Sequence, residues 1–266
     1  MSKAYVETTI LTNVLLKPGS EKESSAKRAL ARYDSTILPV YSIKEWKAGP
    51  LQHFAYFHNK LVATQSLSNT IAALNSLAYS PYKKSTSFEA LEAVTRLDTG
   101  PAPASATREV RDRETADRYR LAVASLILRS WRKRRKVTSQ TVQDLVCYTE
   151  AEPRIGKDGL FDLRPQKCDS TRECSLSTLL KARRDVLIAL RNAIPAMSSR
   201  REDRERRKVL KQLVNTPKLP LGRESCRALG DAIFAFFCPE DAVVLTTNLR
   251  DHEPLARAVG KRAEGP

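Results

Sequence analysis

Short β-branched segments stand near both ends of the chain, and the long stretch between them has the apolar spacing of helices. The segment AYVETTIL opens the chain, TILPVYSI follows soon after, and AVVLTT lies close to the end. Each is rich in Val, Ile, Thr or Tyr and adjoins a helical pattern, which is typical of the strands of a parallel sheet. We therefore predict an α/β fold with a mostly parallel central sheet flanked by helices, plus a large helical insertion or lobe.

Helices are expected between these strands. One is predicted from Glu21 to Tyr33, after the turn signal Pro18-Gly19-Ser20, and another begins near Ser42 and carries Glu45. The segment RDRETADRYRLAVASLILRSWRKRRK predicts one long amphipathic helix that ends in a basic cluster. The next segment, SQTVQDLVCY, is predicted to form a second helix.

The second half of the chain begins with a loop-rich stretch, 149–173, in which Lys157-Asp158-Gly159 predicts the turn of a small hairpin. Helices are expected again over 176–193 and 198–214. The Pro/Ala/Ser-rich stretch DTGPAPASAT is typical of a linker. The predicted division is 1–97 for the N-terminal part of the sheet domain with added helices, 98–106 for the linker, 107–215 for a basic helical insertion or lobe, and 216–266 for the C-terminal part of the sheet domain.

Charge is the most informative feature of the composition. The chain has 46 Lys and Arg against 30 Asp and Glu, a formal net charge of +16. Such an excess favours a polyanionic partner, and nucleic acid is the first candidate. No window approaches the ~18 uninterrupted apolar residues of a membrane span, and no targeting segment is recognisable, so we expect no membrane association. The five cysteines cannot all pair internally, which favours reduced thiols and a cytoplasmic location.

Four carboxylates stand at the edges of apolar elements. Glu7 lies at the first strand, Glu45 at the start of the helix after the second strand, Asp231 at the start of a late helix, and Asp251 just after the last strand. In a parallel sheet, ligands bind at the carboxyl ends of the strands, where these four segments could converge. Clustered carboxylate oxygens suit hard divalent cations.

The same segments resemble a known family. YVETTILTNVLL resembles the opening strand and turn of PIN-domain nucleases, an acidic residue followed by small polar ones. LGDAIFAFFCPEDAVVLTTNLRDHEPL resembles the C-terminal half of the family, with an Asp-Ala-x-Ile/Leu helix, a strand, a Thr-x-Asn turn and an Asp-Phe pair. Two positions differ: Glu7 stands where Asp is more usual, and His252 where Phe is common.

The resemblance implies a PIN-like fold and a site built from matching positions. The catalytic and metal-binding carboxylates would be Glu7, Glu45, Asp231 and Asp251, and the supporting polar residues Thr8, Thr246 and Asn248. Such a site binds Mg²⁺ or Mn²⁺, which orients a scissile phosphate and lowers the pKa of a bound water. The implied activity is that of an endonuclease, with RNA preferred over DNA.

Two other interpretations stay open. The protein could be a nucleic-acid-binding scaffold or regulator whose PIN-like site is degenerate. It could also be a toxin-like or defence nuclease that an inhibitory protein partner holds silent. The carboxylates have simpler explanations too: Glu7 as an edge-strand acid, Glu45 as an acid that complements a helix dipole, and Asp251 as a helix cap.

The basic cluster RSWRKRRK places one tryptophan among cations, enough to bind phosphates and stack one base. Its candidate nucleic-acid-binding residues are Arg129, Trp131, Arg132, Lys133, Arg134, Arg135 and Lys136. The simpler interpretation is a solvated helix end whose cations suit the dipole. SSRREDRERRK alternates charges at helical spacing, which predicts an exposed, salt-bridged helix.

Overall fold

Parallel strands form the central sheet in a computed structural model that describes residues 2–77, 81–97, 100, 107–145, 148, 150–163, 174–195, 197–216 and 221–266. Within these ranges the sheet has five strands in the order β3-β2-β1-β6-β7, and every neighbouring pair is parallel. The strands are β1 (Lys3–Val6), β2 (Ser35–Pro39), β3 (Gln140–Val142), β6 (Ala242–Leu245) and β7 (Arg262–Glu264). The prediction of an α/β fold with a parallel sheet flanked by helices is therefore confirmed.

The central strand explains why the first segment of the chain is so apolar. Ala4, Tyr5 and Val6 are buried, because β1 has a neighbour on each side and helices cover the sheet. From β1 the chain continues to β2 on one side, and β6 lies on the other. The strand order therefore changes direction between β1 and β6, and the carboxyl ends of these two strands are where an open α/β sheet binds its ligands.

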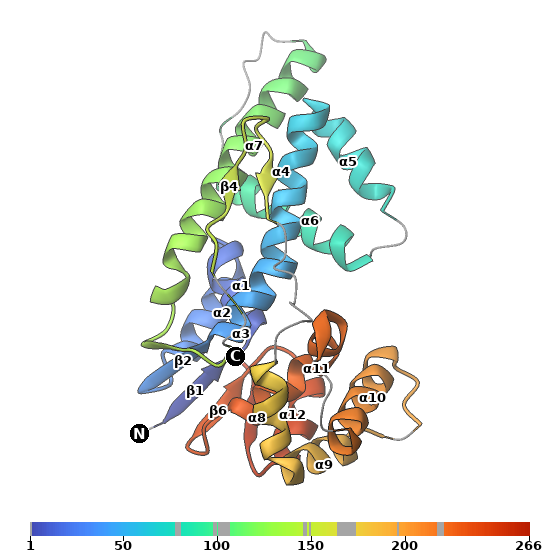
Figure 1. The fold of residues 1–266 in the computed structure, drawn as a ribbon. Helices are drawn as coiled ribbons and strands as arrows, with labels where there is room; N and C mark the ends of the chain where they lie inside the picture. The colour runs from blue at the N-terminus through green and yellow to red at the C-terminus, as the bar shows by residue number, and fades with distance from the viewer. Residues whose placement is uncertain are drawn as a thin grey trace.

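The N-terminal helices form a layer beside the sheet and a projection above it (Figure 1). In chain order they are α1 (Thr8–Leu16), α2 (Glu21–Leu30), α3 (Val40–Trp46), the π-helical turn η1 (Lys47–Leu51), α4 (Gln52–Thr64), α5 (Leu67–Asn75), α6 (Pro81–Arg96), α7 (Arg108–Lys133) and the 3-10 turn η2 (Arg134–Lys136). Helix α7 lies along α4, and α5 and α6 pack beside them (Figure 1). The predicted helix from Glu21 and the long amphipathic helix are both confirmed, the latter with its last residues in the 3-10 turn.

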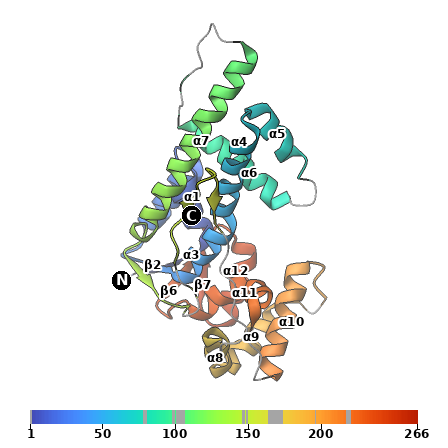
Figure 2. The same cartoon turned by 45° about the horizontal axis from the view of Figure 1, so that its top comes forward.

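The C-terminal part begins with the small antiparallel hairpin of β4 (Arg154–Ile155) and β5 (Phe161–Asp162), which confirms the turn predicted at Lys157-Asp158-Gly159. It continues with α8 (Ser175–Ala182), α9 (Arg184–Ala193), α10 (Arg201–Asn215), α11 (Gly222–Phe237) and α12 (Leu249–Ala258). Helix α10 packs against α9 and α11, and α12 packs against α9 and α11 (Figures 1 and 2). Of these helices, α12 packs directly against β7.

One predicted element is wrong. SQTVQDLVCY was expected to be a helix, but its residues Gln140–Val142 form β3, which pairs with β2 in the register Ile37↔Gln140 and Pro39↔Val142. A free edge of β2 offers backbone donors and acceptors, and the β-branched Thr141 and Val142 fit a pleated surface, so pairing overrides the local helical pattern. Strand β7 was not predicted, since Arg-Ala-Glu has no alternating apolar pattern.

The region 107–215 is joined to the sheet domain by packing as well as by the chain. The Ser130 hydroxyl of α7 donates to the carbonyl of Leu15 at 2.7 Å, and the Trp131 ring stacks on Trp46 with centroids 6.1 Å apart. Trp131 belongs to the main hydrophobic core, and β3 belongs to the central sheet. The region 107–215 therefore shares its core with the sheet domain. The predicted linker, 98–106, lies outside the described residues except for Gly100. Among the helices of the described ranges, none has the length and apolar character to cross a membrane.

Candidate functional site

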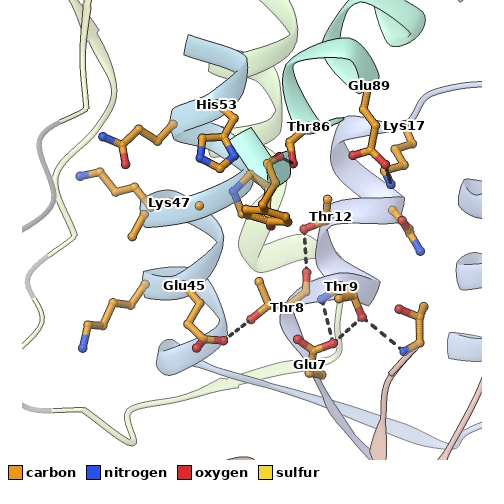
Figure 3. Close-up of a pocket in the computed structure, with 18 of the residues that line it drawn as sticks. Glu7, Thr8, Thr9, Thr12, Lys17, Glu45, Lys47, His53, Thr86 and Glu89 are labelled. Atoms are coloured by element: carbon orange, nitrogen blue, oxygen red, sulfur yellow. Dashed lines mark hydrogen bonds and ion pairs between the residues drawn. The ribbon is translucent and has the colours of Figure 1, made fainter. Parts of the chain in front are cut away.

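A cavity of about 910 Å³ opens at the carboxyl end of β1, between α1, α3, η1, α4 and α6. Figure 3 shows Glu7 and Glu45 at one end of it, with Thr8 between them, and His53, Thr86, Lys17 and Glu89 towards the other end. Two of the four predicted carboxylates thus line one cavity. The position agrees with the rule that ligands bind at the strand ends of an open sheet.

Glu7 is fixed by the turn from β1 into α1. Its backbone N–H donates to the Leu245 carbonyl at 3.0 Å, which continues the pairing of β1 with β6. Its carboxylate caps α1: Oε2 accepts from the Thr9 backbone N–H at 3.0 Å, from the Thr9 hydroxyl, and from the Thr246 hydroxyl at 3.2 Å. The other oxygen, Oε1, accepts no hydrogen bond from the described residues. Glu7 therefore caps α1 through one oxygen, and its other oxygen has no hydrogen bond from the described residues.

Glu45 is half-buried on α3 and faces Glu7 across the first turn of α1. The Thr8 hydroxyl donates to Glu45 Oε2 at 2.9 Å, so Thr8 contacts one of the predicted carboxylates. Burial raises the pKa of Glu45 to about 7, the charges of Glu7 and Asp231 add to the rise, and hydrogen bonds from Thr8 and Tyr41 oppose it. An ionised Glu45 is thus destabilised by its surroundings, as expected where carboxylates gather without a cation.

Asp231 lies close to this pair, but its carboxylate is already occupied. The residue before it, Gly230, breaks the helical geometry of α11 with φ 21°, and a Cβ there would come within 3.8 Å of Glu45 Oε1. The Arg206 guanidinium of α10 donates to Asp231 Oδ2, and His252 Nε2 lies 3.3 Å from Oδ1. The glycine therefore brings α11 against Glu45, while the arginine and histidine hold the Asp231 carboxylate.

Asp251 is held in a different hollow. Arg200 donates to both of its oxygens, at 2.9 Å for Oδ2, and the Asn248 amide donates to Oδ2 at 2.9 Å. The hydrogen bond from Arg200 is the main reason that the pKa of Asp251 falls to about 2. Thr246 and Asn248, the other predicted supporting residues, are joined by a hydrogen bond from the Asn248 N–H to the Thr246 hydroxyl at 2.9 Å.

The four carboxylates therefore lie in two different environments. Glu7 and Glu45 line the cavity, Asp231 lies beside them in an ion pair, and Asp251 lines the second hollow, which also contains Arg200 and Arg206. In the described part of the chain, no group of three or more His, Cys, Asp or Glu side chains is arranged to hold a metal ion. A site with three carboxylate ligands would need Asp231 to leave Arg206.

The walls of the cavity are basic, a feature that the search for carboxylates missed. The cationic residues that line it are Lys17, Lys22, Lys44, Lys47, Lys83 and Arg227, against the three acids Glu7, Glu45 and Glu89. Lys17 is paired with Glu89 at 2.7 Å. The π-helical turn Lys47–Leu51, which contains Pro50, forms part of the wall, and π-turns are frequent at functional sites. The lysines are scattered along the sequence, so no local signal could have gathered them.

The basic cluster at the end of α7 differs from the prediction in one respect. Trp131 is only 3% exposed and lies between Trp46, Lys47 and Arg134, whose guanidinium is 3.8 Å from its ring centroid. A buried ring cannot stack a base, so the proposed role of Trp131 does not fit this arrangement. Of the cations, Arg134 and Arg135 both pair with Glu150, whereas Arg132 lies 3.9 Å from Glu152 with both side chains exposed.

Helix α10 also differs from its prediction. It was expected to be exposed, and Arg201 and Glu205 do form an exposed pair at 2.6 Å. Arg206, however, is buried, because it reaches the Ala228 carbonyl at 3.2 Å and the Asp231 carboxylate. The alternating charges indicated the ion pairs within the helix but carried no information about a partner 25 residues further on.

Comparisons with protein-family models, curated proteins and solved structures found no match for this chain.

Proposed function

We propose that the protein is a metal-dependent endonuclease that hydrolyses phosphodiester bonds, with RNA preferred over DNA. One observation carries the proposal: the buried Glu7 and the half-buried Glu45 face each other at the end of a cavity lined by six cationic side chains and three acidic ones. Cationic walls attract a polyanionic strand, and acidic side chains at the end of the cavity suit a cation bound beside a phosphate. The net charge of +16 supports the same class of substrate.

The residues at this end of the cavity fit Mg²⁺ or Mn²⁺. Glu7 has an oxygen without a hydrogen bond from the described residues, and Glu45 has a pKa raised to about 7 that a nearby cation would lower. Hard cations prefer such oxygen ligands. When bound, the metal would supply Lewis-acid activation of water and phosphate. Asp231 could join as a third ligand if Arg206 releases it.

The chain's own residues would hold and orient the strand. Lys22, Lys47 and Lys83 line the cavity and could bind phosphates, while Thr8 and Thr246 keep the two glutamates in place through their hydroxyls. Fixed carboxylates cost little reorganisation when a cation and a phosphate arrive, and such preorganisation is a large source of rate enhancement. Glu45 could also accept a proton from the attacking water.

A second candidate is a nucleic-acid-binding protein with a degenerate site. The observation that favours it is the pairing of Asp231 with Arg206 and of Asp251 with Arg200. If these ion pairs persist in solution, two of the four predicted ligands are neutralised by the protein itself. The basic cavity would then bind a strand without cutting it.

A cleavage assay tests the proposal. The protein is incubated with mixed single- and double-stranded RNA and DNA in Mn²⁺, Mg²⁺ or EDTA, beside Glu45→Gln, Asp231→Asn and the exposed control Glu92→Gln. We expect cleavage that requires the metal, falls by at least ~100-fold in Glu45→Gln, and is unchanged in the control. Asp231→Asn should lose a similar factor if Asp231 joins the site. Binding without cleavage in any metal would favour the second candidate.

A further inference from the structure

We propose that Tyr82, supported by His53, forms a subsite that binds a nucleobase by stacking, next to the end of the cavity where Glu7 and Glu45 would hold a metal beside a phosphate. The inference rests on the proposed function, because it names how the same cavity takes its substrate. It assigns to Tyr82 the base contact that the buried Trp131 cannot make.

The position of Tyr82 is the first argument. It is the second residue of α6, it lines the cavity, and it is 59% exposed, more than almost any other large apolar or aromatic residue in the described ranges. Its hydroxyl end is directed to the cavity wall, where a Cβ on Gly49 would lie 3.8 Å from Tyr82 Oη. A tyrosine with its hydroxyl against the wall and most of its surface open presents a ring face to whatever enters the cavity.

Tyr82 lines the same cavity as the acidic pair, Glu7 and Glu45. Burial of the hydroxyl raises the pKa of Tyr82, a hydrogen bond with Thr86 opposes the rise, and the charges of Glu89, Glu45 and Glu7 add to it. The tyrosine therefore lies within electrostatic reach of both carboxylates at the end of the cavity. A base on its ring and a phosphate beside a metal at the carboxylates could belong to adjoining parts of one strand.

His53 is the second argument. Its ring meets Tyr82 in a T-shaped contact with centroids 5.1 Å apart and an interplanar angle of 72°, which fixes the tyrosine ring. Burial, together with the nearby cations Lys83 and Arg227, lowers the pKa of His53 to about 4, so its imidazole is neutral at pH 7. Its buried Nδ1 has no hydrogen-bond partner among the described residues. The two rings are thus an uncharged aromatic patch in a wall that also contains six cationic side chains.

The cavity wall has a cationic part and an uncharged aromatic part, and the two together indicate the class of ligand. Phosphates bind to cations, whereas an uncharged aromatic face binds another planar ring, and every nucleobase has such a face. The volume of about 910 Å³ exceeds what a phosphate alone requires and suits a nucleotide with a neighbouring phosphate. A strand could therefore place its phosphates along the lysines and one base on Tyr82.

Binding to a short single-stranded oligonucleotide with a fluorescent 2-aminopurine base tests the inference, in EDTA and low salt so that no metal-dependent cleavage takes place. The variants are Tyr82→Leu, which removes the ring, and Tyr82→Phe, which keeps it. Tyr119→Leu is the control, because Tyr119 is a partly exposed tyrosine of α7 that does not line the cavity. A second oligonucleotide of the same length, with abasic positions only, is measured by competition.

We expect Tyr82→Leu to weaken binding of the base-containing strand by about 5- to 100-fold and to abolish the quenching of 2-aminopurine fluorescence. The abasic strand should bind wild type and Tyr82→Leu almost equally, and Tyr82→Phe and Tyr119→Leu should resemble wild type. Equal weakening of both strands by Tyr82→Leu, or no binding of the oligonucleotide by wild type, would overturn the subsite. Because no metal is used, a failure to cleave in Mn²⁺ would count against the proposed function alone.

Discussion

Two pairs of carboxylates in this protein have opposite surroundings. Glu7 and Glu45 meet hydroxyls and backbone groups at the end of a cavity, and no arginine contacts either of them in the described ranges. Asp231 and Asp251 each receive a guanidinium, from Arg206 of α10 and from Arg200 just before it. The first pair has a carboxyl whose pKa is raised, and the second has one whose pKa is lowered.

The comparison teaches that the position of an acidic residue in a sequence motif does not determine whether its carboxylate is available to bind a cation. In a chain with an excess of cations, a carboxylate at the surface of the core usually meets an arginine unless the fold keeps arginines away. The turn from β1 into α1 does so for Glu7, since its neighbours are Thr8, Thr9 and Thr246. We call Glu7 and Glu45 the open pair, because no arginine of the described residues contacts them. An added cation should be stabilised more at this pair than at Asp231 or Asp251.

The largest effect on stability is expected when an arginine that contacts Asp231 or Asp251 is removed. Arg206 is buried and supports both Asp231 and the Ala228 carbonyl. Arg206→Met keeps most of the volume but leaves a partly buried carboxylate without its partner, so the free energy of unfolding should fall by about 3 kcal/mol or more. Urea denaturation of Arg206→Met and of the exposed control Arg201→Met measures the difference. A loss no greater than in the control would show that the pair is not a structural contact.

A smaller effect is expected from pH at the open pair. The unfolded Glu45 loses its proton near pH 4.5 and the folded one near pH 7, so between these values the folded state binds more protons. Stability from this group is full below about pH 4.5 and is lost as pH rises to 7, by up to about 3 kcal/mol in EDTA. In Glu45→Gln this loss should be absent. Unfolding curves from pH 4 to 8 check it, and identical pH profiles for wild type and Glu45→Gln would contradict it.

The smallest effect is expected in the basic cluster at the end of α7, where paired and exposed cations can be compared. Arg134 and Arg135 are paired with Glu150, whereas Arg132 and Lys133 are exposed at the end of α7. If the basic cluster binds a strand, Arg132→Gln with Lys133→Gln should flatten the dependence of log affinity on log salt by up to ~0.7 per lost contact. Arg134→Gln with Arg135→Gln should flatten it less. Equal slopes in wild type and the first double variant would mean that the cluster is a solvated helix end.

Much of the fold could be predicted because its signals are local. The apolar β1 and β6 segments, the cap at Ser20 and the turn at Gly159 depend on residues that are neighbours in the chain. Strand β3 could not be predicted, because its conformation depends on pairing with β2, about a hundred residues earlier.

The site was predictable to the same degree. The rule for strand ends placed Glu7 and Glu45 near one another, the family resemblance added Thr8, and the structure brings these three residues together. The arginines at Asp231 and Asp251 were missed because α10 reaches them only in the folded chain. Tyr82 and the lysine wall were missed for the same reason, since the residues that line the cavity come from distant helices.

Stabilisation by Mn²⁺ tests most directly the claim that the open pair, Glu7 and Glu45, binds the metal. A cation that binds the native state and not the unfolded chain adds about 2.7 kcal/mol at ~100 times its dissociation constant. We expect wild type and Asp251→Asn to gain this amount in chemical denaturation, and Glu45→Gln to gain much less. A stability that does not respond to Mn²⁺ would contradict the account, and so would a gain that is lost in Asp251→Asn but kept in Glu45→Gln.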